Sequence, residues 1–166
     1  MFTTSFAATE LSLRPAVPND QPFLATLYQS ARPDLHLIQG DEDKINTVRQ
    51  QQHEALQYGV ETQYPNALQF VIEKTQCPVG GLIVDFGHNE VRIIFLAFIP
   101  TARGQGHGKT ILRGLQNAAT QSRSPIAVIV WHNNPGAKKV YTELGFQTEE
   151  THPLSERMVW YPGRSL

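Results

Sequence analysis

The chain has 166 residues, of which 40% are hydrophobic and 17% charged, so it is long enough for one domain around a single core. Its formal net charge is −1, which argues against a general nucleic-acid binder, because such proteins carry a clear excess of basic residues. No apolar run is long enough for a membrane helix and no basic residue precedes the short apolar stretch at the start, so we expect neither a membrane span nor a signal peptide.

A single cysteine, Cys77, leaves no partner for a disulfide within the chain, which is compatible with the cytoplasm as its location. Residues 1–10 have the composition of a flexible N-terminal tail, and residues 11–166 that of one domain. The pattern predicts a first strand at residues 11–17 and a helix after Pro18 with Phe23 and Leu27 on its apolar face. A second helix, poor in apolar residues, is expected over residues 41–57 as a surface or lid element.

The middle of the chain predicts an antiparallel meander, with strands at residues 68–73, 79–86 and 91–99. A helix over residues 107–121 follows, and its apolar stripe would cover the sheet. The next strand, residues 126–131, should run parallel to its predecessor if the connecting helix makes a right-handed crossover.

Two further elements close the domain. A helix is expected to start after Asn134, which suits the N-cap, and to end at Gly145. Strands at residues 146–150 and 158–161 would then form a terminal hairpin.

Residues 100–110 read Pro-Thr-Ala-Arg-Gly-Gln-Gly-His-Gly-Lys-Thr between a strand and a helix. The alternating glycines Gly104, Gly106 and Gly108 allow a tight turn that brings backbone N–H groups to one anion at the positive end of the helix. This predicts a cradle for a diphosphate-bearing cofactor. An ATP-type loop would need glycine where Arg103 stands, and the dinucleotide fingerprint has a different glycine spacing.

The pattern Arg103-x-x-Gly106-x-Gly108, after a strand that ends in proline, resembles motif A of the GNAT superfamily of acyl-CoA-dependent N-acyltransferases. Residues 134–146 are similar to motif B of the same superfamily. The expected order of elements coincides with the GNAT arrangement over about residues 11–161. The resemblance implies an α/β (α+β) fold with about four helices and a mixed central sheet of six to seven strands, splayed between the fourth and fifth strands counted from residue 11.

The resemblance also implies the reaction, in which a primary amine attacks the thioester of acetyl-CoA directly in a ternary complex. The acceptor would be a small molecule or a protein amino group, and no metal, nucleic acid or membrane is implied. Family members often dimerise, so a homodimer is an option. Two alternatives stay open: a GNAT-fold protein that binds acyl-CoA without catalysis, and, with less support, an ATP- or GTP-binding loop protein suggested by Gly108-Lys109-Thr110.

Charge is distributed in accordance with such a cofactor. Residues 91–142 hold seven basic residues and no acidic one, whereas residues 1–90 hold eleven acidic and five basic residues. The basic half contains both motifs, and the acidic half is available to attract a cationic acceptor. Chance segregation of charges on a solvated surface is the alternative interpretation.

By resemblance, the loop amides would bind the diphosphate of the cofactor. The residues concerned are Arg103, Gly104, Gln105, Gly106, His107, Gly108 and Lys109. The Arg103 side chain would either brace the loop or reach a phosphate. His107 is expected to contribute its backbone N–H, with its ring on the helix surface.

The pantetheine arm of the cofactor would lie along Leu96, Ala97 and Phe98 like an added strand, with the N–H of Phe98 stabilising the oxyanion. Tyr141 matches the general acid of the family, which protonates the departing thiolate; the alternative is that it packs against the sulfur or orients it. Asn134 would cap its helix and also bond either to an amide of the cofactor or to a catalytic water.

The general base is not evident from the sequence. Glu90, His132 and Glu73 are candidates, and proton removal through water is the default hypothesis. Trp131 and Trp160 are expected in the core rather than at the acceptor end.

Overall fold

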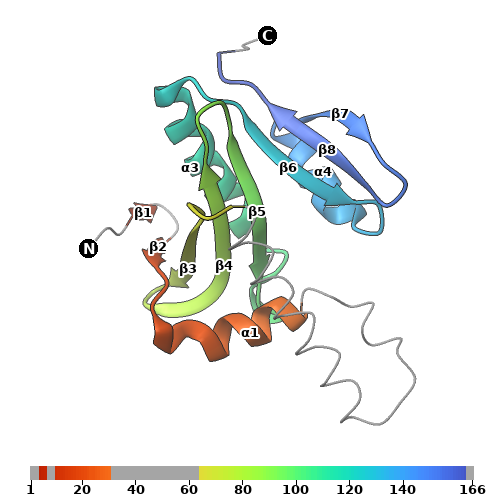
Figure 1. Ribbon diagram of the computed structural model, residues 1–166. Helices are drawn as coiled ribbons and strands as arrows, with labels where there is room; N and C mark the ends of the chain where they lie inside the picture. The colour runs from red at the N-terminus through yellow and green to blue at the C-terminus, as the bar shows by residue number, and fades with distance from the viewer. Residues whose placement is uncertain (1–3, 7–9, 31–63, 164–166) are drawn as a thin grey trace.

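The computed structural model describes residues 4–6, 10–30 and 64–163. A mixed sheet of eight strands in the order β1-β2-β3-β4-β5-β6-β8-β7 forms its centre (Figure 1). The strands are β1 Thr4–Phe6, β2 Leu11–Pro15, β3 Leu68–Lys74, β4 Cys77–Phe86, β5 Val91–Phe98, β6 Ile126–Trp131, β7 Gln147–Thr151 and β8 Ser155–Trp160. The helices are α1 Gln21–Ser30, α3 His107–Ser122 and α4 Pro135–Glu143, with short 3-10 turns η1 Pro18–Asp20 and η3 Pro100–Ala102.

Every strand expected from residue 11 onward is present, with bounds that differ by a few residues. The additional strand is β1, which pairs with β2 antiparallel and lies in the segment predicted to be a flexible tail. This part of the tail prediction is wrong, because β2 offers an open edge to which Thr4–Phe6 adds. The helix predicted over residues 41–57 lies outside the described residues.

The sheet opens between β5 and β6. This is the parallel pair predicted from the crossover helix, and it has only three residue pairs, Val91↔Ile126, Arg92↔Ala127 and Ile93↔Val128. Beyond them β6 continues to pair with β8, and β5 with β4, so the two strands diverge, as Figure 1 shows. We call this opening the seam; it confirms the predicted splay.

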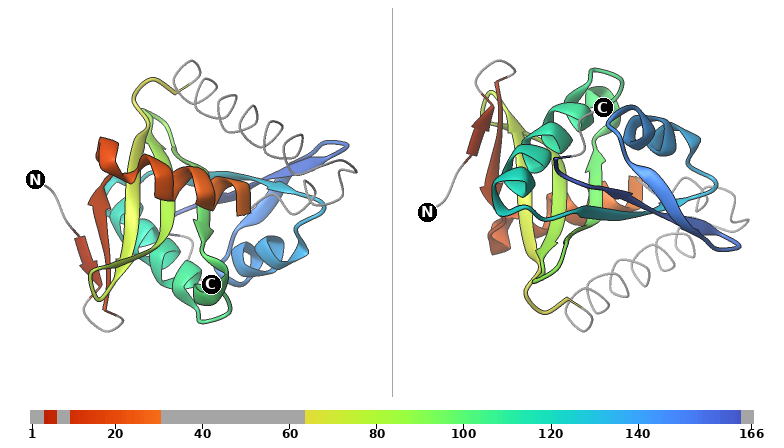
Figure 2. Two further views of the ribbon diagram at one scale, coloured as in Figure 1. Left: turned by 90° about the horizontal axis from the view of Figure 1, so that it is seen from below. Right: turned by 90° about the horizontal axis from the view of Figure 1, so that it is seen from above.

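Helices cover the two faces of the sheet unequally (Figure 2). Helices α3 and α4 lie on one face, where Ile111, Leu112 and Leu115 of α3 enter the larger core cluster. Helix α1 lies on the other face and packs Leu24 and Leu27 into a second cluster. The helical spacing of these apolar residues gives each helix one buried stripe, as the sequence predicted.

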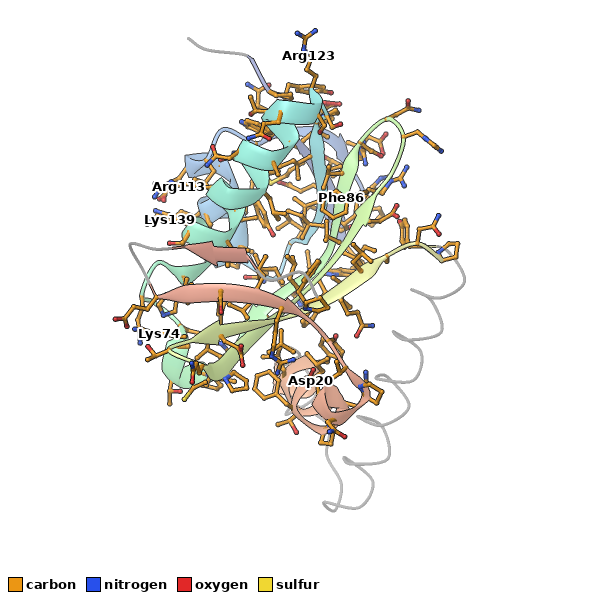
Figure 3. The ribbon with its side chains drawn as sticks, turned by 90° about the vertical axis from the view of Figure 1, so that its left-hand side faces the viewer. Asp20, Lys74, Phe86, Arg113, Arg123 and Lys139 are labelled. Carbon is orange, nitrogen blue, oxygen red and sulfur yellow. The ribbon has the colours of Figure 1, made fainter. Side chains whose placement is uncertain are left out.

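An ion pair fixes the start of α1 against β2, in the region labelled Asp20 in Figure 3. Both Asp20 carboxylate oxygens accept hydrogen bonds from Arg14 at 2.8 Å, and Oδ2 also accepts one from the N–H of Val17 at 2.7 Å. The hydrogen bonds from Arg14 lower the pKa of Asp20, although burial opposes the shift. Arg14 Nε is also 3.2 Å from Glu73 on β3.

The longest described helix, α3, has 16 residues and an amphipathic pattern. Within residues 4–6, 10–30 and 64–163, no helix combines the length and the hydropathy needed to cross a bilayer.

Candidate active site

The loop before α3 turns at two glycines in the left-handed region, Gly104 with φ 76° and Gly106 with φ 81°. A Cβ atom at either position would meet nothing within 4 Å, so the loop surface is open there. The first backbone hydrogen bond of α3 runs from the N–H of Thr110 to the carbonyl of Gly106 at 3.2 Å. The N–H groups of the preceding residues, from His107 to Lys109, are therefore not used by the helix and are suited to an anion.

Arg103 braces this loop. Its Nε donates to the carbonyl oxygen of Phe98 at 2.9 Å, which ties the loop to the end of β5. Gln105 adds a second brace by donating from Nε2 to the carbonyl of Thr101 at 3.0 Å. Of the two roles left open for Arg103, the geometry supports the bracing role.

His107 does not have the exposed ring that the sequence suggested. The residue is 8% exposed, its ring centroid is 5.9 Å from that of Phe98, and its Nε2 is 3.1 Å from Gln105 Oε1. Burial, with a smaller contribution from the charge of Lys74, lowers the pKa of His107. The expectation of a surface ring is wrong because the first turn of α3 packs against β5, so that the imidazole fills the space under the loop.

The side chain of Lys109 turns away from the loop. Its Nζ forms an ion pair with Glu143 of α4, which links the two helices on this face of the sheet. Any contribution of Lys109 to the anion site therefore comes from its backbone N–H.

The open edge of β5 provides the second part of the site. The N–H of Ile99 donates to Val79 of β4 at 2.9 Å, whereas the carbonyl of Phe98 faces the other way and accepts from Arg103. In an extended strand the N–H and C=O of one residue point to the same side, so the N–H of Phe98 points into the seam. Leu96 and Ala97 are half-buried, as are the other residues from 94 to 99, although β5 is a central strand. The seam thus exposes this edge of β5.

Tyr141 lies on α4 and is 7% exposed, with its ring edge-to-face against Phe146 at 5.1 Å. Burial raises its pKa, so the phenol retains its proton over the neutral range. Its hydroxyl has no hydrogen-bond partner within the described ranges. Asn134 caps α4 as predicted, since its Oδ1 accepts a hydrogen bond from the N–H of Ala137 at 3.2 Å.

Two of the three candidate bases are carboxylates held by arginine. Glu73 lies on β3, two strands away from β5 at the seam, and it pairs with Arg14 of β2. Glu90 lies just before the closed end of the seam and accepts from Arg157 at 2.6 Å and from Arg92 at 2.9 Å. Burial tends to raise the pKa of Glu90, but the two arginines outweigh it and lower the pKa.

His132, the third candidate, follows the last residue of β6. Its Nε2 is 2.7 Å from the carbonyl oxygen of His152 and its Nδ1 is 3.8 Å from Glu156 Oε2. The ring is thus directed toward the β7–β8 hairpin rather than the seam. The structure therefore brings none of the three candidates to the seam as an unpaired group.

Glu156 of β8 is a buried charged residue that the sequence analysis missed. It is 4% exposed and is contacted by Lys138 of α4 at 3.2 Å and by Thr148 of β7 at 3.0 Å. Burial tends to raise its pKa, but the hydrogen bonds from Thr148 and Lys138 outweigh this and lower it. The signal in the sequence is its alternation with Met158, which places Glu156 on the helix-covered face of β8. This carboxylate ties α4, and with it Tyr141, to the hairpin.

Trp131 departs from the expected core position. It is 56% exposed at the end of β6, and Ile129 on the same face is 50% exposed. Trp160 is half-buried and packs against the larger core cluster.

Within the described residues, no group of three or more His, Cys, Asp or Glu side chains is arranged to hold a metal ion.

The sequence matches the model of the acetyltransferase (GNAT) family over residues 24–146, which is well over half of the chain. The chain belongs to this family. It is therefore an acyltransferase. A comparison with curated proteins gives no match.

Solved GNAT structures share the fold at low sequence identity. The PaiA N-acetyltransferase of Thermoplasma acidophilum, in complex with coenzyme A, aligns with a TM-score of 0.70 and 14% identity over 91% of this chain and 98% of its own. The spermidine N-acetyltransferase of Vibrio cholerae, in complex with CoA and spermine, aligns with a TM-score of 0.65 and 18% identity over 93% and 97% of the two chains. An acetyltransferase from Thermus thermophilus gives a TM-score of 0.66 and 21% identity over 92% and 97%.

Proposed function

We propose that this acyltransferase transfers an acetyl group from acetyl-CoA to a primary amine by direct attack in a ternary complex. The observation that carries the proposal is the exposed edge of β5, where the N–H of Phe98 points into the seam beside the loop of α3. Two neighbours with the same fold bind coenzyme A, and one of them binds spermine, an amine.

The cofactor's parts match separate parts of this site. The diphosphate would bind the backbone N–H groups from Gly104 to Lys109, at the positive end of α3. The N–H of Arg103, which the sequence analysis included, instead donates to the carbonyl of Pro100 at 3.3 Å. The pantetheine arm is peptide-like and would pair with Leu96, Ala97 and Phe98 as a strand does. The N–H of Phe98 would then face the thioester oxygen as negative charge develops on it.

In the chemical step the amine nitrogen attacks the carbonyl carbon, so that a C–N bond forms and the C–S bond breaks. The thiolate takes the proton of the Tyr141 hydroxyl, and the proton that the acetylated nitrogen releases returns through water to the phenolate. Because burial raises the pKa of Tyr141, the phenol is protonated when the thiolate leaves. Its hydroxyl, buried and without a hydrogen-bond partner among the described residues, supports this role.

The acceptor ammonium must lose a proton before it attacks. Since Glu73, Glu90 and His132 are each engaged elsewhere, water at the open seam is the proposed route for this proton. The engagement of these groups also favours a second candidate function, a non-catalytic acyl-CoA sensor of the same fold.

Two measurements test the proposal. Acetyl-CoA at about 100 times its Kd should raise the melting temperature, as linkage predicts from about 2.7 kcal/mol of stabilisation, whereas ATP with magnesium should not. Thiol release from acetyl-CoA with a panel of amines should then exceed the rate without an amine. Stabilisation by acetyl-CoA without amine-dependent thiol release would indicate the sensor, and absence of both would overturn both functions.

Location and assembly remain predictions. The single cysteine, Cys77, is exposed and forms no disulfide, which is compatible with the reducing cytoplasm that we propose as the site of action. A homodimer is proposed only by analogy with the family, and sedimentation analysis would test it.

A further inference from the structure

Strand β6 carries large apolar side chains on a face that no described helix covers. Its buried residues Val128 and Val130 belong to the larger core cluster under α3 and α4. Ile129 and Trp131 alternate with them and therefore lie on the α1 side of the sheet, with exposed fractions of 50% and 56%. Two large apolar side chains exposed side by side on one strand indicate a binding surface.

The position of this pair relative to the seam is fixed by register. The last residue pair between β5 and β6 is Ile93↔Val128, so Ile129 is the first residue of β6 beyond the point of opening. Across the opening, Ile94 and Ala97 of β5 are half-buried members of the α1-side cluster. The seam is thus lined by apolar side chains on its α1 side, opposite the face that bears α3 and α4.

Charged side chains lie where β5 and β6 are still paired, at the closed end of the seam, and they form ion pairs with one another. Arg92 contacts Glu90 at 2.9 Å and Asp85 at 3.1 Å, while Arg157, directly opposite Ile129 on β8, contacts Glu90 at 2.6 Å. The two carboxylates therefore have no unpaired charge to offer a polyamine. Glu150 lies farther out on β7, beside His152.

We propose that Trp131, together with Ile129, is the surface on which the apolar body of the acceptor amine packs, so that the acceptor class is a monoamine with an aromatic or bulky aliphatic group. The amine would reach the acetyl group through the seam from the α1 side, while its carbon body covers the exposed Trp131 ring. This inference rests on the proposed function, and it makes Trp131 a specificity residue rather than a catalytic one.

Phenethylamine and spermidine are suitable probes, because the first has an aromatic body and one charge and the second is a polycation. We expect the wild-type protein to acetylate phenethylamine with a kcat/KM at least about tenfold higher than that for spermidine. Trp131→Ala should raise the KM for phenethylamine about tenfold, as expected for loss of an aromatic contact, and leave the KM for acetyl-CoA unchanged. Trp131→Phe should restore most of the affinity.

Phe86→Ala is the matched control, since Phe86 is also 50% exposed but lies at the far end of β4 on the opposite face of the sheet (Figure 3). It should leave both KM values unchanged. Calorimetric titration of the CoA-saturated protein with phenethylamine gives a readout that does not need turnover. Binding that weakens in Trp131→Ala would support the inference even if no amine were acetylated, in which case only the proposed function would fall.

Three results would overturn the inference. One is normal acetyl transfer with a KM for phenethylamine that does not respond to Trp131→Ala. Another is wild-type protein that neither binds nor acetylates phenethylamine. The third is a dimer that dissociates in Trp131→Ala while acceptor kinetics stay the same, which would assign this face to a second copy of the chain.

Discussion

Burial keeps two ionisable side chains of the site uncharged at neutral pH. It lowers the pKa of His107 under the glycine loop and raises that of Tyr141 on α4. The imidazole then serves as packing beneath the loop, whereas the phenol keeps its proton, which in the proposed mechanism passes to a leaving thiolate whose basicity desolvation also raises. Under the proposed function, the same physical cause gives His107 a structural role and Tyr141 a chemical one.

Tyr141→Phe should lower kcat about 100-fold, in the range expected for loss of a general acid, while the KM for acetyl-CoA changes less than about twofold. Because burial raises the pKa of Tyr141, the wild-type kcat should not decline on its alkaline side up to about pH 10. Steady-state kinetics from pH 6 to about 10 would check both points. An unchanged kcat with weakened acetyl-CoA binding would contradict the acid role.

Arg103→Gln should weaken acetyl-CoA binding about tenfold, because it removes a charged hydrogen bond that holds the loop to the carbonyl of Phe98. Calorimetry with acetyl-CoA would measure the change. Arg113→Gln is the control, since Arg113 is exposed on α3 (Figure 3) and should have no effect. Equal losses in the two variants would mean that charge, rather than bracing, matters.

At the scale of elements, glycine at position 80 sets how closely β4 approaches β5. A Cβ atom there would lie 2.6 Å from the carbonyl oxygen of Ala97 and 2.8 Å from the Phe98 ring. The position of β5 at the seam therefore depends on the absence of a side chain at Gly80 of β4.

Gly80→Ala should destabilise the protein by about 1–3 kcal/mol, the usual cost of overpacking, and should weaken acetyl-CoA binding because β5 must shift. Gly136→Ala is the control: its Cβ would find only Asn134 Oδ1, at 3.9 Å, and alanine favours the helix. Urea denaturation of both variants would test this, and equal stabilities would refute the close-packing argument.

Much of the element order could be predicted because local sequence signals mark where helices and strands begin and end. Strand β6 has the predicted bounds, and α4 begins after its Asn134 cap and ends before Gly145, because caps, prolines and glycines act over a few residues. Whether one element covers the surface of another depends on residues far apart in the chain, and no short sequence pattern signals it. The β1 pairing, the buried ring of His107 and the exposed ring of Trp131 each depend on which surface another element covers, so the sequence pattern did not reveal them.

The candidate site divides in the same way. Its backbone part, the glycine loop and the open edge of β5, follows from short motifs and strand order. The contacts that engage Glu73, Glu90 and His132 join residues up to 67 positions apart, as between Arg157 and Glu90, and depend on the assembled sheet. They could not be read from spacing.

On the scale of the whole molecule, buried and paired ionisable groups limit stability at both ends of the pH range. The pKa values of Asp20, Glu90 and Glu156 are lowered, so their stabilisation is present above the ordinary values of 3.8 and 4.5 and is lost as pH falls through the folded values. Burial raises the pKa of Tyr28 to about 12 and also raises that of Tyr141, so their contribution is present below 10.0 and is lost as pH rises above it.

The free energy of unfolding should therefore show a plateau between about pH 7 and pH 9 and fall on both sides, because the lowered pKa of buried His107 adds a decline below its ordinary value of 6.5. Urea titrations at intervals from about pH 3 to 11 would reveal it. Tyr28→Phe should flatten the alkaline decline, since phenylalanine does not titrate. An alkaline slope that is identical in this variant would contradict the assigned cause.

The narrow join between β5 and β6 also bears on how such a protein can evolve. Mutation replaces side chains but leaves every peptide group in place, so the open edge of β5 persists through most substitutions in its strand. The apolar surface formed by Ile129 and Trp131 is made of side chains, so a single substitution is enough to change it. Under the proposed function, descendants of one ancestor therefore exchange one acceptor amine for another while the backbone contacts to the shared nucleotide carrier are inherited unchanged.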